Sequence, residues 1–431
     1  MSQPDTIGER AVGRVKWHLV PLLFVLYIIN WIDRVNLGYA ALTMNKELAI
    51  TSAAFGALGA SFFISYFLFE VPSNMLLNRY GARKWLARIM VSWGIMTILT
   101  GFAHNYWHVY IARFLLGMME AGFFPGVVFY FTLWIPQKQR ARVMAAFMLA
   151  LPVSNIIGAP ASTWILDNIH YLGLSGWRWL FVLEGLPAVL FGVITFFYLT
   201  DRPSEAKWLT EPERDWLVNE IKKEDEAKQD AGHVRLKDMF SNMRTWRLGV
   251  IYLFLAMVGV GLPLWLPTIV KDFSRVSNTS VGMLLLIPYG FAAIAMIFWG
   301  WHSDRTMERK YHAAIAVVCG AVGLFLAAMV HNVWVEMIGV VLAVTGFSAL
   351  LPPFWAIPGL YLAGASAAVG LAIINSCNSL GGFIAGYVSG YLRGIGNGAV
   401  LSYFGICYII ALAMLLTLPI KREEKTGNKE G

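Results

Sequence analysis

Charged residues are scarce in this chain. Asp, Glu, Lys and Arg together make up 14% of its 431 residues, while hydrophobic residues make up 58%. A soluble globular protein carries about 25% charged residues. The shortage of charge excludes an ordinary soluble protein and predicts a helical protein that crosses a membrane many times. The net charge of +8 then reflects the orientation of the loops, and we expect no nucleic acid among the partners.

Cysteine is also rare, and the three cysteines all fall in apolar segments. Neither their number nor their spacing indicates a disulfide framework or a metal site. We find no metal-ligand spacing among the histidines, no phosphate-binding loop and no nucleophile–base set. We therefore expect no enzyme, no metal and no cofactor. We also expect no cleavable leader, because the first 16 residues are polar and the first apolar segment is long enough to span.

Long apolar runs dominate what is present. Each is close to the ~20 residues that a helix needs to cross the hydrocarbon core of a bilayer. We predict an all-α membrane protein with twelve transmembrane helices in two pseudo-symmetric halves of six. The expected spans cover residues 18–41, 53–77, 84–103, 108–135, 142–166, 178–200, 247–270, 280–302, 312–331, 334–362, 366–391 and 398–420.

A polar stretch rich in Lys, Glu and Asp separates the two sets of spans. It divides the chain into an N-terminal half (1–200), a cytoplasmic linker (201–245) and a C-terminal half with a short cytoplasmic tail (246–431). The linker serves either as a hinge or as a solvated connection. Most basic residues outside the spans lie in loops on the side of the two termini, so the positive-inside rule predicts that both termini are cytoplasmic.

Four charged residues fall deep inside the predicted spans of the N-terminal half. Asp33 and Arg34 lie in the first span, and Arg113 and Glu120 share one helix face of the fourth. Such residues are costly in a membrane, usually face a cavity, and mark a substrate or proton path. The alternative is that they only hold helices together, but two pairs at similar depth favour a functional role.

The type of charge suggests the chemistry. A guanidinium binds a carboxylate through two parallel hydrogen bonds, whereas a carboxylate in a desolvated cavity can exchange a proton. Moving an anion into a negative-inside cell is opposed by about 2.3 kcal/mol per charge per 100 mV. Because co-transport of more protons than substrate charges reverses that sign, proton–anion symport is the expected mechanism.

A short loop motif occurs twice, each time after the second span of a half. The second copy contains Gly300, Asp304 and Arg305 in the pattern G-x-x-x-D-R, while the first has Asn74 and Asn78 at the Gly and Asp positions. Both copies resemble the signature loop of the major facilitator superfamily. The resemblance implies two six-helix halves with a substrate site between them near the midplane.

Four further strings resemble the anion:cation symporter branch of that superfamily, and the similarity extends over essentially the whole chain. They are Asp33-Arg34 in the first span, R-x6-E-A-G-F-F-P-G beginning at Arg113, F-W-A-I-P beginning at Phe354, and I-I-N-S around Asn375.

The resemblance to this branch implies a role for each internal charge. Asp33 and Glu120 would carry protons. Arg34 would bind the carboxylate of the substrate, and Arg113 would pair with Glu120 at the same site. The residues implied as lining the substrate cavity are Tyr66, Trp355 and Asn375.

The implied protein is a secondary active transporter that works by alternating access in the bacterial inner membrane. We expect it to be a monomer that binds a small organic anion and protons and lies in a lipid bilayer. Tartrate or a sugar acid such as an aldonate is the favoured substrate. The alternatives are an aromatic carboxylate such as hydroxyphenylacetate, a proton-driven exporter, or a carboxylate sensor that does not transport.

Overall fold

The computed structural model describes residues 6–230, 243–360 and 365–419, and within these ranges the chain forms helices and no β-strand. The helices of the N-terminal half are α1 (Ile7–Glu47), α2 (Ser52–Tyr80), α3 (Ala82–Thr100), α4 (Tyr106–Glu120), α5 (Phe123–Trp134), α6 (Gln137–Met148), α7 (Ala150–Asn168) and α8 (Gly176–Tyr198). The later helices are α9 (Glu211–Asp230), α11 (Met243–Ser274), α12 (Asn278–Thr306), α13 (Lys310–Met329), α14 (Val333–Ala356), α15 (Ala365–Arg393) and α16 (Asn397–Leu416).

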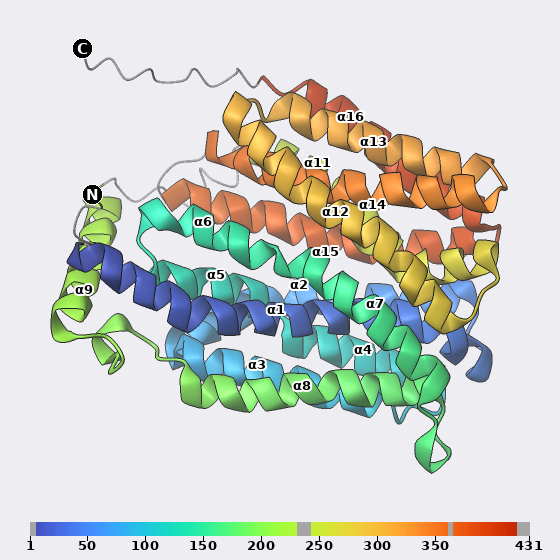
Figure 1. The fold of residues 1–431 in the computed structure, drawn as a ribbon, viewed down its shortest axis with the longest axis horizontal. Helices are drawn as coiled ribbons and strands as arrows, with labels where there is room; N and C mark the ends of the chain where they lie inside the picture. The colour runs from blue at the N-terminus through green and yellow to red at the C-terminus, as the bar shows by residue number, and fades with distance from the viewer. Residues whose placement is uncertain (1–5, 231–242, 361–364, 420–431) are drawn as a thin grey trace, which may run out of the picture. The chain divides into compact units, whose positions relative to one another are not determined.

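The twelve predicted spans are confirmed by these helices (Figure 1). Ten stretches of the described residues are long and apolar enough to cross a membrane, with α4–α5 and α6–α7 each forming one stretch. The other two spans are α3, which carries three basic residues near its start, and α15.

The fourth span is broken between Glu120 and Phe123. Gly122 adopts a left-handed conformation with φ of +90°, and a Cβ atom there would lie 2.5 Å from Oγ of Ser73. Only glycine fits such a position without strain. Pro125 then falls in the first turn of α5, where its missing N–H has no helical partner to lose. The break therefore follows from the string E-A-G-F-F-P. It places Glu120 at the end of one helix and the aromatic residues Phe123 and Phe124 at the start of the next.

The fifth span is interrupted at Leu149, which separates α6 from α7. Pro152 lies three residues later. A proline removes the hydrogen bond to the carbonyl four residues earlier and collides with that carbonyl, which here belongs to Met148, the last residue of α6. Pro160 lies inside α7 without ending it.

The chain forms two compact units that do not follow the order of the sequence. The first unit contains Met1–Asn36, Ser61–Asn155 and Ile169–His233. The second unit contains Leu37–Ala60, Ile156–Asn168 and Val234–Gly431. The second unit thus combines the C-terminal helices with the end of α1, the start of α2 and most of α7.

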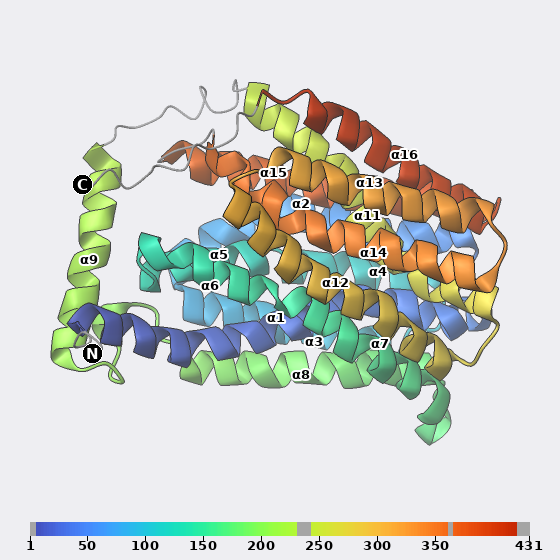
Figure 2. The ribbon, with the colours of Figure 1, turned by 45° about the horizontal axis from the view of Figure 1, so that its top comes forward.

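In the first unit, α3 and α8 lie side by side along their lengths (Figures 1 and 2). Their backbones approach closely at Gly94 and Gly185, where a Cβ on either residue would lie 2.8 Å from the carbonyl oxygen of the other. Small residues are the usual means of close helix contact in membranes. Helices α3 and α8 therefore pack closely against each other in this unit.

The start of the predicted linker packs against α1. Helix α9 lies beside the N-terminal end of α1 (Figures 1 and 2), and Glu213 forms an ion pair with Arg14 at 2.8 Å. Trp208 stacks on His18 with ring centroids 4.1 Å apart, and Leu217 is fully buried. This part of the linker is therefore helical and attached to the first unit, while residues 231–242 lie outside the described residues.

In the second unit, helices from the N-terminal half meet helices from the C-terminal half. Asp167 at the end of α7 accepts hydrogen bonds from the backbone N–H of Thr279 at 2.7 Å and from the side chain of Asn278 at 2.7 Å, at the first turn of α12. Gly56 of α2 lies against Gly386 of α15, where a Cβ on Gly56 would come within 2.3 Å of a carbonyl oxygen. These contacts hold the two sets of helices together at this end.

Candidate functional site

The centre of the first unit contains a buried carboxylate with two donors. Glu120 is fully buried at the end of α4, just before the break. Its Oε1 accepts hydrogen bonds from Nε of Arg34 at 2.5 Å and from the side-chain amide of Asn30 at 2.8 Å. Asn30 and Arg34 lie one helical turn apart on α1, so a single face of that helix holds Glu120.

Two aromatic residues of α2 support the guanidinium groups. The Cζ atom of Arg34 lies 4.9 Å from the ring centroid of Tyr66 and 5.7 Å from that of Phe62. Arg113 of α4 contacts the same Phe62 ring at 5.0 Å. Aromatic faces attract cations most strongly when both are desolvated. The two arginines therefore share one aromatic support, and their like charges favour an anion near them.

Several polar atoms of this cluster lack a hydrogen-bond partner although they are buried. They are Nη2 of Arg34, Nε and Nη1 of Arg113, and Oε2 of Glu120. Arg113 is 2% exposed. The large majority of buried side-chain polar atoms in proteins have a hydrogen-bond partner, and each exception calls for an explanation. Three unpaired guanidinium nitrogens and one unpaired carboxylate oxygen form a set that can bind an anion and accept a proton.

Asp33 lies next to Arg34 in the sequence but has a separate environment. Its Oδ2 accepts a hydrogen bond from Nε1 of Trp93 on α3 at 2.7 Å, and its Oδ1 accepts one from the side chain of Asn36 at 3.2 Å. Both Asp33 and Trp93 are fully buried. The carboxylate is thus held by neutral donors, whereas Glu120 is held by a cation.

The structure does not show the predicted direct pairing of Arg113 with Glu120. The ion-pair partner of Glu120 is Arg34. Seven residues place Arg113 and Glu120 on one face of α4, but the two lie about 10 Å apart along the axis at 1.5 Å per residue. Arg34 reaches Glu120 from the neighbouring helix α1 instead, which leaves nitrogens of Arg113 without an acceptor.

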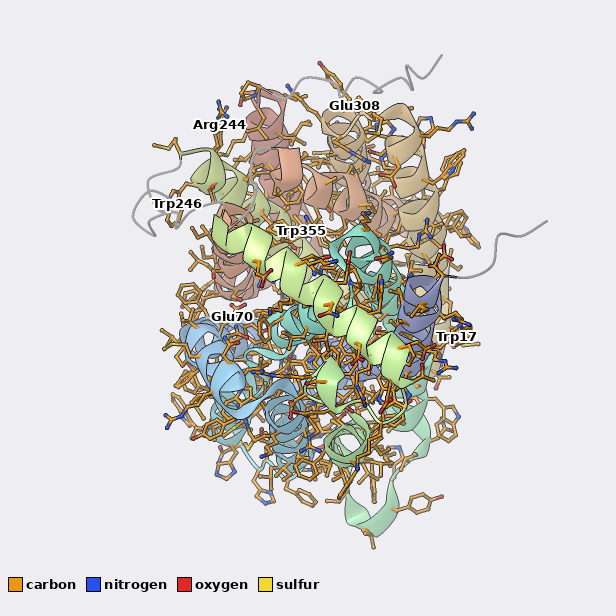
Figure 3. The ribbon with its side chains drawn as sticks, turned by 90° about the vertical axis from the view of Figure 1, so that its left-hand side faces the viewer. Trp17, Glu70, Arg244, Trp246, Glu308 and Trp355 are labelled. Atoms are coloured by element: carbon orange, nitrogen blue, oxygen red, sulfur yellow. The ribbon has the colours of Figure 1, made fainter. Side chains whose placement is uncertain are left out.

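Two predicted cavity residues lie in the second unit. Trp355 is at the end of α14 (Figure 3), where its ring meets that of Tyr252 on α11 edge-on at 4.9 Å. Tyr252 also stacks on Phe354 at 5.1 Å. Asn375 is partly buried on α15. The second unit thus offers aromatic surface and an amide rather than charge.

Sequence reasoning missed Asn30 and Trp93. Asn30 carried a signal, because it lies four residues before Arg34 and therefore on the same face of α1. Trp93 carried none, because nothing in the sequence indicates that the middle of α3 lies beside Asp33. That contact depends on how the helices pack.

The family model of the Major Facilitator Superfamily matches residues 23–386 and 276–430. The chain belongs to the major facilitator superfamily. This confirms the fold predicted from the repeated loop and the two sets of six spans.

Relatives of similar length carry transporter names. The chain is 40% identical over 416 residues to a protein of Agrobacterium vitis named "Putative tartrate transporter", with 96% of each chain covered. It is 37% identical over 407 residues to a "Quinolone resistance transporter" of Acinetobacter baumannii, with 94% of each covered. It is 34% identical to the "Inner membrane transport protein RhmT" of Escherichia coli, covering 88% of this chain and 87% of that protein.

Among solved structures, the fold is similar to that of a D-xylose–proton symporter. The TM-score is 0.76 at 16% identity, and the alignment covers 94% of this chain and 98% of the symporter. At this identity the likeness establishes the fold alone. The tartrate name of the relatives agrees with the organic-anion branch that the strings around Arg113 and Asn375 resemble.

Proposed function

We propose that this transporter carries a small organic carboxylate together with protons, by symport and alternating access, across a bacterial inner membrane with both termini in the cytoplasm. Tartrate or an aldonate is the favoured substrate. The observation that carries this proposal is the set of unpaired guanidinium nitrogens on Arg34 and Arg113. An anion with two or more oxygen atoms supplies the acceptors that these buried donors need.

Glu120 links the anion to a proton. Arg34 now binds Glu120, so an incoming carboxylate competes with Glu120 for the same guanidinium. Two carboxylates cannot both remain ionised at one buried cation without repulsion. Uptake of one proton by Glu120 relieves that repulsion, and its unpaired Oε2 is a position at which the proton can bind. Asp33 supplies a second proton site with neutral partners.

The contacts between α7 and α12 suit an alternating-access cycle. Asp167 holds the first turn of α12, where the helix dipole favours a negative charge. Under the proposed orientation this end faces the periplasm. An alternating-access cycle would break these contacts and restore them.

The test is uptake of labelled tartrate into proteoliposomes, with the external solution more acidic than the lumen. We expect accumulation above the external concentration that a protonophore abolishes. Competition by unlabelled gluconate and hydroxyphenylacetate then separates a hydroxy-acid site from an aromatic-acid site. Absence of proton-driven uptake for all three carboxylates would contradict the proposal.

A variant of Arg113 tests whether the unpaired guanidinium nitrogens bind the substrate. We expect Arg113→Gln to reduce tartrate affinity about tenfold or more, since a hydrogen bond to a charged group contributes about 1.5–3 kcal/mol. Arg14→Gln is the control, because Arg14 is also an arginine of the first unit but pairs with Glu213 on α9. Equal affinity of the two variants would remove Arg113 from the site.

The relative named for quinolone resistance supports a second candidate, a proton-driven exporter. In that case an inward proton gradient accelerates efflux of a preloaded quinolone such as norfloxacin and does not drive tartrate uptake. The same vesicles therefore distinguish the two functions by the direction in which the probe moves.

A further inference from the structure

Trp93 joins the two carboxylates of the first unit. Its indole N–H donates to Oδ2 of Asp33 at 2.7 Å. Its ring meets the ring of Phe123 edge-on, with centroids 5.1 Å apart and an interplanar angle of 87°. Phe123 is the first residue of α5, directly after the break that follows Glu120. One side chain therefore contacts Asp33 at one atom and the broken span of Glu120 at its ring.

The polar and charged groups around Asp33 show what the contact with Trp93 does. Both of its hydrogen bonds among the described residues come from neutral donors, the indole of Trp93 and the amide of Asn36. The charged groups within electrostatic reach are Glu184 on α8 and Glu120 and Arg113 on α4. Two of these three are negative and one is positive, and the indole of Trp93 adds a hydrogen bond that stabilises the charged form of the carboxylate.

The break between α4 and α5 allows the contact between Phe123 and Trp93 to change. A continuous α-helix would fix Glu120 and Phe123 rigidly to each other, whereas Ala121 and Gly122 connect two separate helices. Phe123 is fully buried inside the first unit. A change at Glu120, such as loss of its ion pair with Arg34, can therefore alter the angle between α4 and α5 and shift the ring of Phe123 against Trp93.

We propose that Trp93 is a positioning residue that couples Glu120 to Asp33, by donating a hydrogen bond that stabilises ionised Asp33 until movement of Phe123 withdraws the indole N–H. This rests on the proposed symport. When the N–H leaves Oδ2, one proton from the solvent binds there, and when it returns that proton is released. Substrate binding at Arg34 is then linked to proton exchange at a carboxylate that the substrate need not touch.

The central variant is Trp93→Phe, which keeps an aromatic ring but removes the donor. Trp134→Phe is the matched control, because Trp134 is a fully buried indole of the same unit whose Nε1 has no hydrogen-bond partner. Phe123→Leu removes the ring contact and leaves the indole in place. It also serves if Trp93→Phe does not fold.

The first measurement does not need transport. In purified full-length protein, an infrared carboxyl band that disappears in Asp33→Asn reports protonation of Asp33 as the pH is varied. We expect its midpoint to rise by about one pH unit in Trp93→Phe, the size expected for loss of a hydrogen bond to a charged group. We expect less than half that change in Phe123→Leu and none in Trp134→Phe. An unchanged midpoint in Trp93→Phe, or an equal one in Trp134→Phe, would overturn the proposal.

The second measurement uses tartrate in proteoliposomes. We expect Trp93→Phe to move the pH profile of uphill uptake upward by the same amount, while exchange of labelled for unlabelled tartrate at equal pH keeps its KM. A raised KM with an unmoved pH profile would show that Trp93 only packs the site. Failure of wild-type uptake would contradict the proposed symport, and the infrared midpoint would still decide the role of Trp93.

Discussion

The interiors of the two units differ in charge. Every aspartate, glutamate and arginine that is buried among the described residues belongs to the first unit, from Asp33 to Glu213. In the second unit the described buried polar residues are Ser, Thr and one His, and the residues around Trp355 are aromatic. Under the proposed symport this difference assigns two tasks, since proton exchange and charge recognition need ionisable groups whereas selection among substrates of equal charge needs shape and neutral hydrogen bonds.

The largest expected effect comes from removing the ionisable groups of the first unit. We expect Asp33→Asn and Glu120→Gln each to abolish accumulation of tartrate against its gradient, because the side chain can no longer exchange a proton. Glu213→Gln is the control, as it neutralises a buried, ion-paired acid of the same unit on α9. The measurement is steady-state accumulation in proteoliposomes under a pH gradient. Full uphill transport by either variant would show that its carboxylate is not required.

A smaller loss is expected when the charge of the first unit is kept but its geometry is changed. Arg34→Lys replaces a planar group that donates to Glu120 and lies over Tyr66. A point charge cannot donate two parallel hydrogen bonds to a carboxylate. We expect the KM for tartrate to rise about tenfold while uptake remains proton-dependent. An unchanged KM would remove Arg34 from the substrate site.

Changes in the second unit should alter selectivity and leave coupling intact. We expect Trp355→Phe and Asn375→Ala to raise the KM for tartrate about threefold to tenfold, the range given by loss of one neutral hydrogen bond of about 1 kcal/mol. The pH midpoint of uptake should not move. If these variants lose proton-driven accumulation but still exchange tartrate, coupling is not confined to the first unit.

The two copies of the signature loop show a milder form of the same contrast. In the second copy, Arg309 pairs with Asp304 within the loop. In the first copy Asn78 replaces the acid, and Asp201 from the segment after α8 accepts a hydrogen bond from the backbone N–H of Arg83 at 2.8 Å. A more distant part of the chain thus supplies the missing carboxylate at the first turn of α3.

The smallest expected effect comes from removing the carboxylate of Asp201 at the first turn of α3. We expect Asp201→Asn to lower the free energy of unfolding by about 1 kcal/mol, the usual contribution of a capping side chain, since its ion pair with Arg83 is partly exposed and contributes little. Thermal unfolding of the purified protein measures this, with Glu205→Gln on the same segment as the control. A loss above about 3 kcal/mol would indicate that the loop is more than a local cap.

Sequence alone was sufficient where the physical cause is local. The twelve spans follow from apolar length. The break after Glu120 was not predicted, although Gly122 and Pro125 account for it once the structure is known. The sequence also singled out Asp33, Arg34, Arg113 and Glu120 as candidate site residues, because charge inside an apolar span is costly. Partner choice was less predictable: the family resemblance implied Arg113 as the partner of Glu120, while the guanidinium of Arg34 on another helix is the one in contact.

What the sequence determined by itself is the membrane fold, the two sets of six spans and the presence of two acids and two bases inside the N-terminal half. These depend on hydrophobicity and on the residues at each turn. Only the tertiary structure decided that Glu120 pairs with Arg34, that Asp33 receives the indole of Trp93, and that Asp201 replaces the acid missing at position 78. Each of these contacts joins segments on different elements of the fold, and the packing of those elements has no signature in the local sequence.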